Sequence, residues 1–214
     1  MKQIILFFDT ETTGIRKNGF IPRVVQIGAL LADEDGKTIS ELNILLQPEG
    51  FSGVPPQAAN VHGFTTGMVQ AFGVDRKNGL STFFDLVENA DILVAHNNEY
   101  DLDLMQIEID CFSGKLRFDG HGIMPGHAEK WQEQLNSVQN FCTMQNTRDI
   151  LKLPLSAAQA SFFKDTGNDQ QYKNPRLIEA YNHFFGKDFE GAHDAMADVR
   201  ACRDVYFELH KLKA

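Results

Sequence analysis

Three short segments of the chain carry side chains that could form one catalytic site. The first holds Asp9 and Glu11, which are separated by one residue at the end of an apolar run. Side chains at i and i+2 of a strand project to the same side, so these carboxylates would lie together. Neighbouring carboxylates repel each other unless a cation neutralises them, and hard divalent ions prefer such oxygen ligands. Taken alone, however, an acidic pair is more often a solvated strand end than a metal site.

The other two segments add two carboxylates and a histidine. Asp101 follows the apolar run 92–95 and a polar turn, which places it just beyond a strand end, where open α/β sheets bind ligands. His193 and Asp198 would lie about 140° apart on one continuous helix. Both can therefore face one site only if His193 belongs to the loop or first turn that enters the helix. In isolation, Asp101 could instead favour the helix dipole, and Asp198 could lie on the surface.

The elements that must position these side chains are predicted by hydrophobic patterning. The predicted strands are apolar or strand-like runs at 4–8, 24–32, 39–46, 92–95 and 141–144. The predicted helices have apolar residues at helical spacing, at 80–89, 99–109 and 195–212. An Asp-Glu-Asp-Gly turn at 33–36 indicates a hairpin between the second and third strands. Strands that first form a meander and then alternate with helices indicate an α/β domain with a mixed central sheet.

Composition narrows the class of protein. The chain has 214 residues, of which 43% are hydrophobic and 23% charged, values typical of a globular domain and not of a disordered or fibrous protein. We expect a single domain over 1–214. The formal net charge of −9 excludes a histone-like basic coat for nucleic acid. It does not exclude a nucleic-acid enzyme whose metal ions supply the local positive charge.

Cysteine usage and hydropathy predict the compartment. The chain has three widely spaced cysteines and no C-x-x-C, which argues against a disulfide framework or a zinc ribbon and favours a reducing compartment. The first apolar run ends at Asp9, too early for a signal peptide, and no apolar span is long enough to cross a membrane. We therefore expect a cytoplasmic protein with no membrane partner.

Some segments are interpreted as structural. Four glycines and a proline lie within 114–126, so we expect a Gly-rich loop or insertion around 111–140. The acidic group Asp103, Glu108 and Asp110 is interpreted as a solvated helix face. The Phe pairs at 83–84, 162–163 and 184–185 could stack on bases, but such pairs are more often core residues.

Taken together, the three segments resemble a known family. D-x-E-T-T-G at 9–14, A-H-N-x-x-Y-D at 95–101 and H-x4-D at 193–198 are similar, in order and context, to the three motifs of the DEDDh (DnaQ-like) 3′→5′ exonucleases. That family includes the proofreading epsilon subunit. The resemblance extends over 4–206 and implies an RNase H-like fold, with a five-stranded mixed sheet whose second strand is antiparallel and which helices flank.

The resemblance implies a role for each motif residue. The catalytic set would be Asp9, Glu11, Asp101, His193 and Asp198. Its four acids would hold two divalent metal ions, Mg²⁺ or Mn²⁺, and its histidine would be the general base that takes a proton from water. The substrate-binding set would be Thr10, Thr12, Ile15, His62, Asn97 and Tyr100. Tyr100 stands where Phe is usual in the family, a change that still permits stacking on a base.

The activity implied by the resemblance is metal-dependent hydrolysis at single-stranded 3′ ends, of DNA ahead of RNA, with release of nucleoside 5′-monophosphates. Such an enzyme would serve DNA repair or proofreading. The alternatives are an RNA 3′-end trimming exoribonuclease and a non-catalytic nucleic-acid or polymerase-binding module. The intact catalytic set argues against the module. Because the chain stops at Ala214, soon after the third motif, we expect a free-standing nuclease or one that docks a polymerase partner through its surface.

Overall fold

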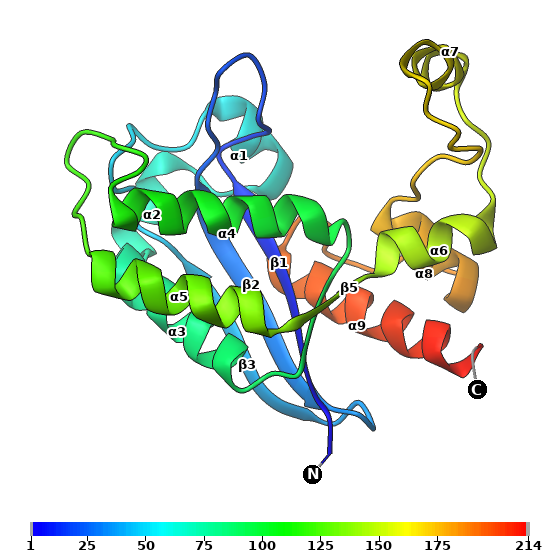
Figure 1. The fold of residues 1–214 in the computed structure, drawn as a ribbon, viewed down its shortest axis with the longest axis horizontal. Coiled ribbons are helices and arrows are strands. Elements are labelled where there is room, and N and C mark those ends of the chain that lie inside the picture. Colours follow the sequence, from blue (N-terminus) through cyan, green and yellow to red (C-terminus); the bar gives the residue numbers. More distant parts are fainter. Residues whose placement is uncertain (1, 213–214) are drawn as a thin grey trace.

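A mixed sheet of five strands is the centre of the computed structural model, which describes residues 2–212 (Figure 1). The strands are β1 (Ile4–Thr12), β2 (Val24–Asp33), β3 (Thr38–Leu45), β4 (Ile92–Ala95) and β5 (Gln139–Cys142). Their order in the sheet is β3-β2-β1-β4-β5. β2 is antiparallel to both β1 and β3, whereas β4 is parallel to β1 and β5. The predicted fold class, including the antiparallel second strand, is confirmed.

Helices cover both faces of this sheet. In chain order they are α1 (Pro56–His62), α2 (Thr66–Phe72), α3 (Arg76–Glu88), α4 (Asn98–Ser113), α5 (Pro125–Ser137), α6 (Thr143–Leu151), α7 (Ala157–Thr166), α8 (Leu177–Phe185) and α9 (Ala195–Lys211). Helices α3, α4 and α5 pack on one face, and α9 packs on the other with α8 outside it. None of the helices within residues 2–212 is long and apolar enough to cross a membrane.

The alternation of side chains along β1 explains why both faces are covered. Leu6 and Phe8 are fully buried in the core under α3, α4 and α5, whereas Ile5 and Phe7 are buried under α9. Each such side chain contributes about 1.5–3 kcal/mol when it is removed from water. The pair at 83–84 is fully buried, as expected, and the ring of Phe83 packs against Phe8. β1 is therefore fixed by packing on both of its faces.

The region around 111–140 differs from the expected Gly-rich loop or insertion. Only 114–124 is a loop, and the residues from Pro125 to Ser137 form helix α5. Proline is tolerated in the first turn of a helix because its missing N–H would have no partner there. Trp131 of α5 stacks on Phe84 at 5.2 Å between ring centroids and meets Phe112 edge-on at 5.3 Å. The helix is therefore part of the core.

The segment 152–176, which contains α7, projects away from the sheet (Figure 1). No residue of α7 is buried, and Phe162 is 61% exposed, so the Phe pair of this helix is not a core pair. His96 is the residue after β4, and its Nε2 lies 3.0 Å from the carbonyl oxygen of Pro175. This contact ties the end of the projecting segment to the strand that precedes Asp101.

Candidate active site

The first two motifs meet at one edge of the sheet. Asp9 and Glu11 lie in the last part of β1, and Asp101 lies in the first turn of α4, just after β4. Because β1 and β4 run parallel, their C-terminal ends share this edge. Asp101 is only 3% exposed, and its Oδ1 accepts a hydrogen bond of 2.7 Å from the hydroxyl of Thr10.

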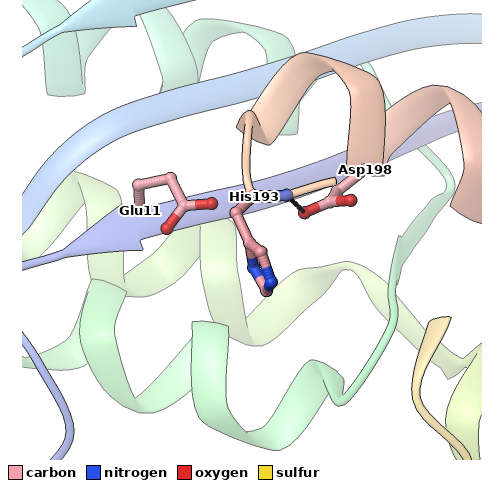
Figure 2. Close-up of side chains that lie close together, drawn as sticks. All are labelled: Glu11, His193 and Asp198. Atoms are coloured by element: carbon pink, nitrogen blue, oxygen red, sulfur yellow. Dashed lines mark hydrogen bonds between the residues drawn. The ribbon is translucent and has the colours of Figure 1, made fainter. Parts of the chain in front are cut away.

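The third motif reaches the same edge through the start of α9. Asp194 is the N-cap, and its side chain accepts hydrogen bonds from the backbone N–H groups of Met196 and Ala197. His193 precedes the N-cap and has φ 72°, so it lies in the loop before α9. The spacing of His193 and Asp198 in the sequence required this position if both are to face one site. The backbone N–H of His193 donates to Oδ2 of Asp198 at 3.1 Å (Figure 2). The left-handed turn thus allows both side chains to face one site.

Two residues of β2, Gln26 and Gly28, determine where the loop before α9 lies. Neither of them was identified from the sequence. The side-chain oxygen of Gln26 accepts from the backbone N–H of Ala195 at 3.1 Å, and its amide donates to Asp194 at 3.3 Å. At Gly28, a Cβ would lie 2.6 Å from the carbonyl carbon of Ala195, so a side chain would push α9 away. The signal for Gly28 was present, because an isolated glycine inside a strand often marks a close backbone approach.

The pairing of β2 with β1 places Gln26 and Gly28 beside the acids of the first motif. Gln26 pairs with Glu11, and Gly28 pairs with Asp9. The start of α9 is therefore seated beside the acidic end of β1. Glu11, His193 and Asp198 offer potential ligand atoms that all lie within 4.8 Å of one another (Figure 2). We call Asp9, Glu11, Asp101 and Asp198 the acidic cluster.

The acidic cluster is electrostatically uncompensated. Burial raises the pKa of Glu11 to about 8, and the charges of Asp198 and Asp101 add to the effect. Burial likewise raises the pKa of Asp101 to about 7 and that of Asp198 to about 6. For Asp9, burial and the neighbouring carboxylates raise the pKa well above its usual range. In the described part of the chain, no Lys or Arg forms an ion pair with any of these four acids.

This donor set fits divalent cations. Carboxylate oxygens crowded without a basic partner are the ligands that Mg²⁺ and Mn²⁺ prefer. Burial and mutual repulsion raise the pKa values of these acids, and a bound cation would oppose both effects.

Four of the predicted substrate-binding residues surround the turn after β1. Nε2 of His62 donates to the backbone oxygen of Thr12 at 3.2 Å, and the hydroxyl of Tyr100 donates to the oxygen of Gly14 at 2.9 Å. The hydroxyl of Thr12 also bonds within the turn, donating to Gly14 at 2.8 Å. Ile15 follows with 68% of its surface exposed. The structure thus gathers an exposed apolar side chain and a rigid turn beside the acidic cluster.

The other two predicted substrate-binding residues have different settings. Thr10 is buried, and its hydroxyl is directed at Asp101, so it holds an acid in place. Asn97 is the residue before α4 and has φ 72°, with no side-chain hydrogen bond to the helix start. Contact with substrate remains a prediction for all six residues.

The family model of the RNase T exonucleases, described as exonuclease, matches residues 6–113, which is half of the chain and includes the first two motifs. The chain belongs to the exonuclease family. With its sheet order and its motifs, it groups with the DnaQ-like family of 3′→5′ exonucleases in the RNase H-like superfamily. A comparison with curated protein sequences finds no match for this exonuclease.

Solved structures of exonuclease I have the same fold as this exonuclease. One has a TM-score of 0.68 and 18% identity, covering 99% of this chain and 41% of the other. E. coli exonuclease I with a 5cy-dT13 oligonucleotide has a TM-score of 0.66 and 18% identity, covering 100% and 41%. The zinc-bound E. coli exonuclease I–single-stranded DNA complex has a TM-score of 0.66 and 17% identity, covering 100% and 41%. The chain thus spans about two-fifths of the length of these proteins.

Proposed function

We propose that this chain is a metal-dependent exonuclease that hydrolyses phosphodiester bonds from single-stranded 3′ ends, with DNA favoured, and releases nucleoside 5′-monophosphates. The observation that carries the proposal is the acidic cluster with His193 beside it, on the fold of an exonuclease family. Structural neighbours in complex with single-stranded DNA support the choice of substrate. The whole of 1–214 is taken as one domain, because the third motif lies outside the matched residues 6–113 and is nevertheless held against β2.

Membership of the exonuclease family implies dependence on divalent metal ions. We propose that the four residues of the acidic cluster hold two ions, Mg²⁺ or Mn²⁺. Bound ions of this kind neutralise the phosphate, lower the pKa of water and stabilise the departing oxygen. The chain contributes the fixed positions of the ligands, since Thr10 holds Asp101 and the backbone N–H of His193 holds Asp198.

His193 is proposed as the general base. Its ring is exposed between Glu11 and Asp198, where it can accept a proton from an attacking water. The turn with Thr12 and Gly14 would receive the terminal nucleotide, with Ile15 against its base. His62 and Tyr100 would keep that turn rigid through their hydrogen bonds to its carbonyl oxygens.

Replacing His193 tests the base directly. We expect His193→Asn to lower the single-turnover rate about 10²-fold, the lower end of the usual worth of a positioned base. Asparagine is chosen because it tolerates the left-handed backbone of this position. The exposed His183 of α8 offers the matched control, His183→Asn, which should keep the rate. A near-normal rate in His193→Asn would remove this residue from the mechanism.

The activity itself is tested with oligonucleotides labelled at the 5′ or the 3′ end. With Mg²⁺ or Mn²⁺, a 5′-labelled single strand should give a ladder that shortens from the 3′ end, and the 3′ label should appear as a nucleoside 5′-monophosphate. Excess EDTA should abolish cleavage. Parallel DNA and RNA strands give the sugar preference, and faster cleavage of RNA would favour the exoribonuclease. Full hydrolysis in excess chelator contradicts the metal-dependent mechanism.

The proposal extends to a role in DNA repair or proofreading, in which a polymerase would be the partner that supplies mismatched 3′ ends. Preferential removal of a mismatched over a matched 3′ nucleotide would support this role, and equal rates would argue against it. The free thiols of Cys111, Cys142 and Cys202 support the expected cytoplasmic location.

A further inference from the structure

A pocket of about 290 Å³ opens beside the turn that follows β1. Three aromatic rings from three separate connections line it: Phe20 from 13–23, Phe51 from 46–55 and Phe118 from 114–124. Thr13 forms another part of its wall. We propose that this aromatic pocket receives one base of the bound single strand, upstream of the nucleotide that is removed. The inference rests on the proposed function and adds a subsite to it.

The pocket adjoins the acidic cluster through the chain itself. Thr13 follows Glu11 by two residues, a distance of at most about 7 Å along an extended chain. Two hydrogen bonds fix this wall, because the N–H of Thr13 donates to the oxygen of Arg23 at 3.0 Å and the N–H of Arg23 donates to Oγ1 of Thr13 at 2.9 Å. The next residue, Gly14, is held by Tyr100. A strand whose 3′ end lies at the acidic cluster therefore has the pocket within reach.

The charges behind the pocket are already paired. Arg23 is 1% exposed, and its Nε and Nη2 donate to the carboxylate of Glu108 at 3.1 and 2.8 Å. Arg76 donates to the same carboxylate at 3.0 Å. We call Arg23, Arg76 and Glu108 the buried ion cluster. Because the strong acceptor of Glu108 occupies the guanidinium of Arg23, the pocket offers rings and not a free cation. Its chemistry suits the flat, neutral surface of a base better than a phosphate.

The rings are held ready for stacking. The guanidinium of Arg23 lies over Phe51 at 5.4 Å and over Phe118 at 4.9 Å from the ring centroids. These cation–π contacts fix two of the rings from behind. Phe20 stands at the rim with 43% of its surface exposed. A base that stacks on an aromatic side chain gains binding whatever its identity, which suits an enzyme that removes successive nucleotides without sequence preference.

Abasic oligonucleotides locate the base that enters the pocket. We would measure binding of fluorescent eight-nucleotide thymidine strands by anisotropy, with Ca²⁺ in place of Mg²⁺ to slow hydrolysis. Each strand carries one abasic site, placed in turn at the second to the sixth position from the 3′ end. One position should weaken binding to the wild-type chain about tenfold, the worth of one stacked base.

Two variants of the pocket test whether that penalty arises there. Phe20→Ala removes the rim ring, and Ser52→Trp fills the pocket from an exposed position in its lining. Ser52→Trp should reduce the abasic penalty to less than about twofold, because its ring takes the space of the base, and Phe20→Ala should lower the penalty, because one of the three stacking rings is lost. Ile39→Ala is the control, since Ile39 is 53% exposed near the start of β3, at the opposite end of the sheet from the acidic cluster, and should keep the full penalty. Thermal melts establish that each variant folds, and Ser52→Trp decides the matter if Phe20→Ala does not fold.

The outcomes separate this inference from the proposed function. A chain that shows the penalty but does not hydrolyse DNA or RNA supports the pocket and overturns the exonuclease. A chain that hydrolyses strands but binds all abasic strands equally, or keeps the penalty in both pocket variants, overturns the pocket alone. A chain that neither binds nor hydrolyses any strand overturns both.

Discussion

Two groups of buried charge in this protein are built in opposite ways. In the buried ion cluster, burial alone would raise the pKa of Glu108, but the charges of Arg76 and Arg23 lower it to about 2. In the acidic cluster, burial and like charges act together, and the pKa of Glu11 rises to about 8. Within residues 2–212, the fold thus supplies two arginine partners for Glu108 and no Lys or Arg ion pair for the four residues of the acidic cluster. The difference separates a charge that the fold neutralises from charges that the proposed metal ions would neutralise.

Removing the carboxylate of the buried ion cluster should have the largest effect. Glu108→Gln leaves two buried guanidinium groups without a counter-charge, which typically costs about 3–5 kcal/mol of the free energy of unfolding. Urea unfolding measures this loss. Asp103→Asn in the same helix is the control, since Asp103 is 45% exposed in its ion pair with Arg16 and should cost less than about 1 kcal/mol. Equal losses in both variants would mean that the buried ion cluster has no special role.

Removing a carboxylate of the acidic cluster should have the opposite pattern. Asp9→Asn should lower the single-turnover rate about 10²–10³-fold, the usual scale for losing one electrostatic contact at a reacting centre. The metal-free variant should melt no lower than the wild type, because one source of repulsion has gone. The exposed Glu99, which lies two residues before Asp101 in the first turn of α4 and is not part of the acidic cluster, provides the control Glu99→Gln. A large loss of stability with the rate retained would make Asp9 structural.

The pH dependence of stability should also distinguish the acidic cluster from the buried ion cluster. The pKa values of Asp198, Asp101 and Glu11 in the folded chain are raised to about 6, 7 and 8. Raised pKa values mean that the neutral forms of these acids favour the folded state. This contribution to stability is complete below pH ~4 and is lost as the pH rises through the three values. The metal-free chain should therefore melt lower at pH 9 than at pH 5, by about 2–4 °C for each kcal/mol lost. The pKa of Glu108 is lowered, so this residue is ionised at pH 5 and at pH 9 and contributes about equally to stability at both pH values.

Saturating Mg²⁺ should flatten this decline, because bound cations favour the ionised carboxylates. Melting scans from pH 5 to pH 9, with and without Mg²⁺, provide the measurement. A metal-free melting temperature that rises with pH would contradict the uncompensated state of the acidic cluster.

A surface ion pair should have the smallest effect and completes the comparison. Arg200 and Glu41 are 2.9 Å apart, with side chains 51% and 41% exposed. Water already solvates both charges, so Arg200→Ala should change the free energy of unfolding by less than about 1 kcal/mol. A loss as large as that of Glu108→Gln would show that burial is not what distinguishes these charges.

The sequence predicted the acidic cluster better than the buried ion cluster. Asp9 and Glu11 follow an apolar run within β1, and Asp101 follows the apolar β4 after a short polar turn, so local pattern alone places them at a sheet edge. Glu108 was interpreted as part of a solvated helix face, and this was wrong, because the residue is fully buried. Its partners Arg23 and Arg76 lie 85 and 32 residues away in the chain, and nothing local signals such pairing.

The same limit explains the other differences. Helix α5 was missed because Pro125 and Gly126 occupy its first turn and resemble loop residues in isolation. The role of Gln26 depends on Ala195, 169 residues later, and only the register of β2 with β1 brings that contact to the acids. Strands and motifs could be predicted from neighbouring residues, whereas contacts between distant segments required the folded chain.

The docking of the start of α9 on β2 also determines when the proposed active site is first complete. Ribosomes deliver β1, β2 and β4 long before the segment with His193 and Asp198, and the contact of Gln26 with that segment closes a loop of 168 residues. This contact cannot form until the segment with His193 and Asp198 has been synthesised. A nascent chain therefore carries three of its four acids with no helix to complete them. If the proposed function holds, catalysis would begin only after α9 has docked on β2, and an unfinished chain would not cleave nucleic acid.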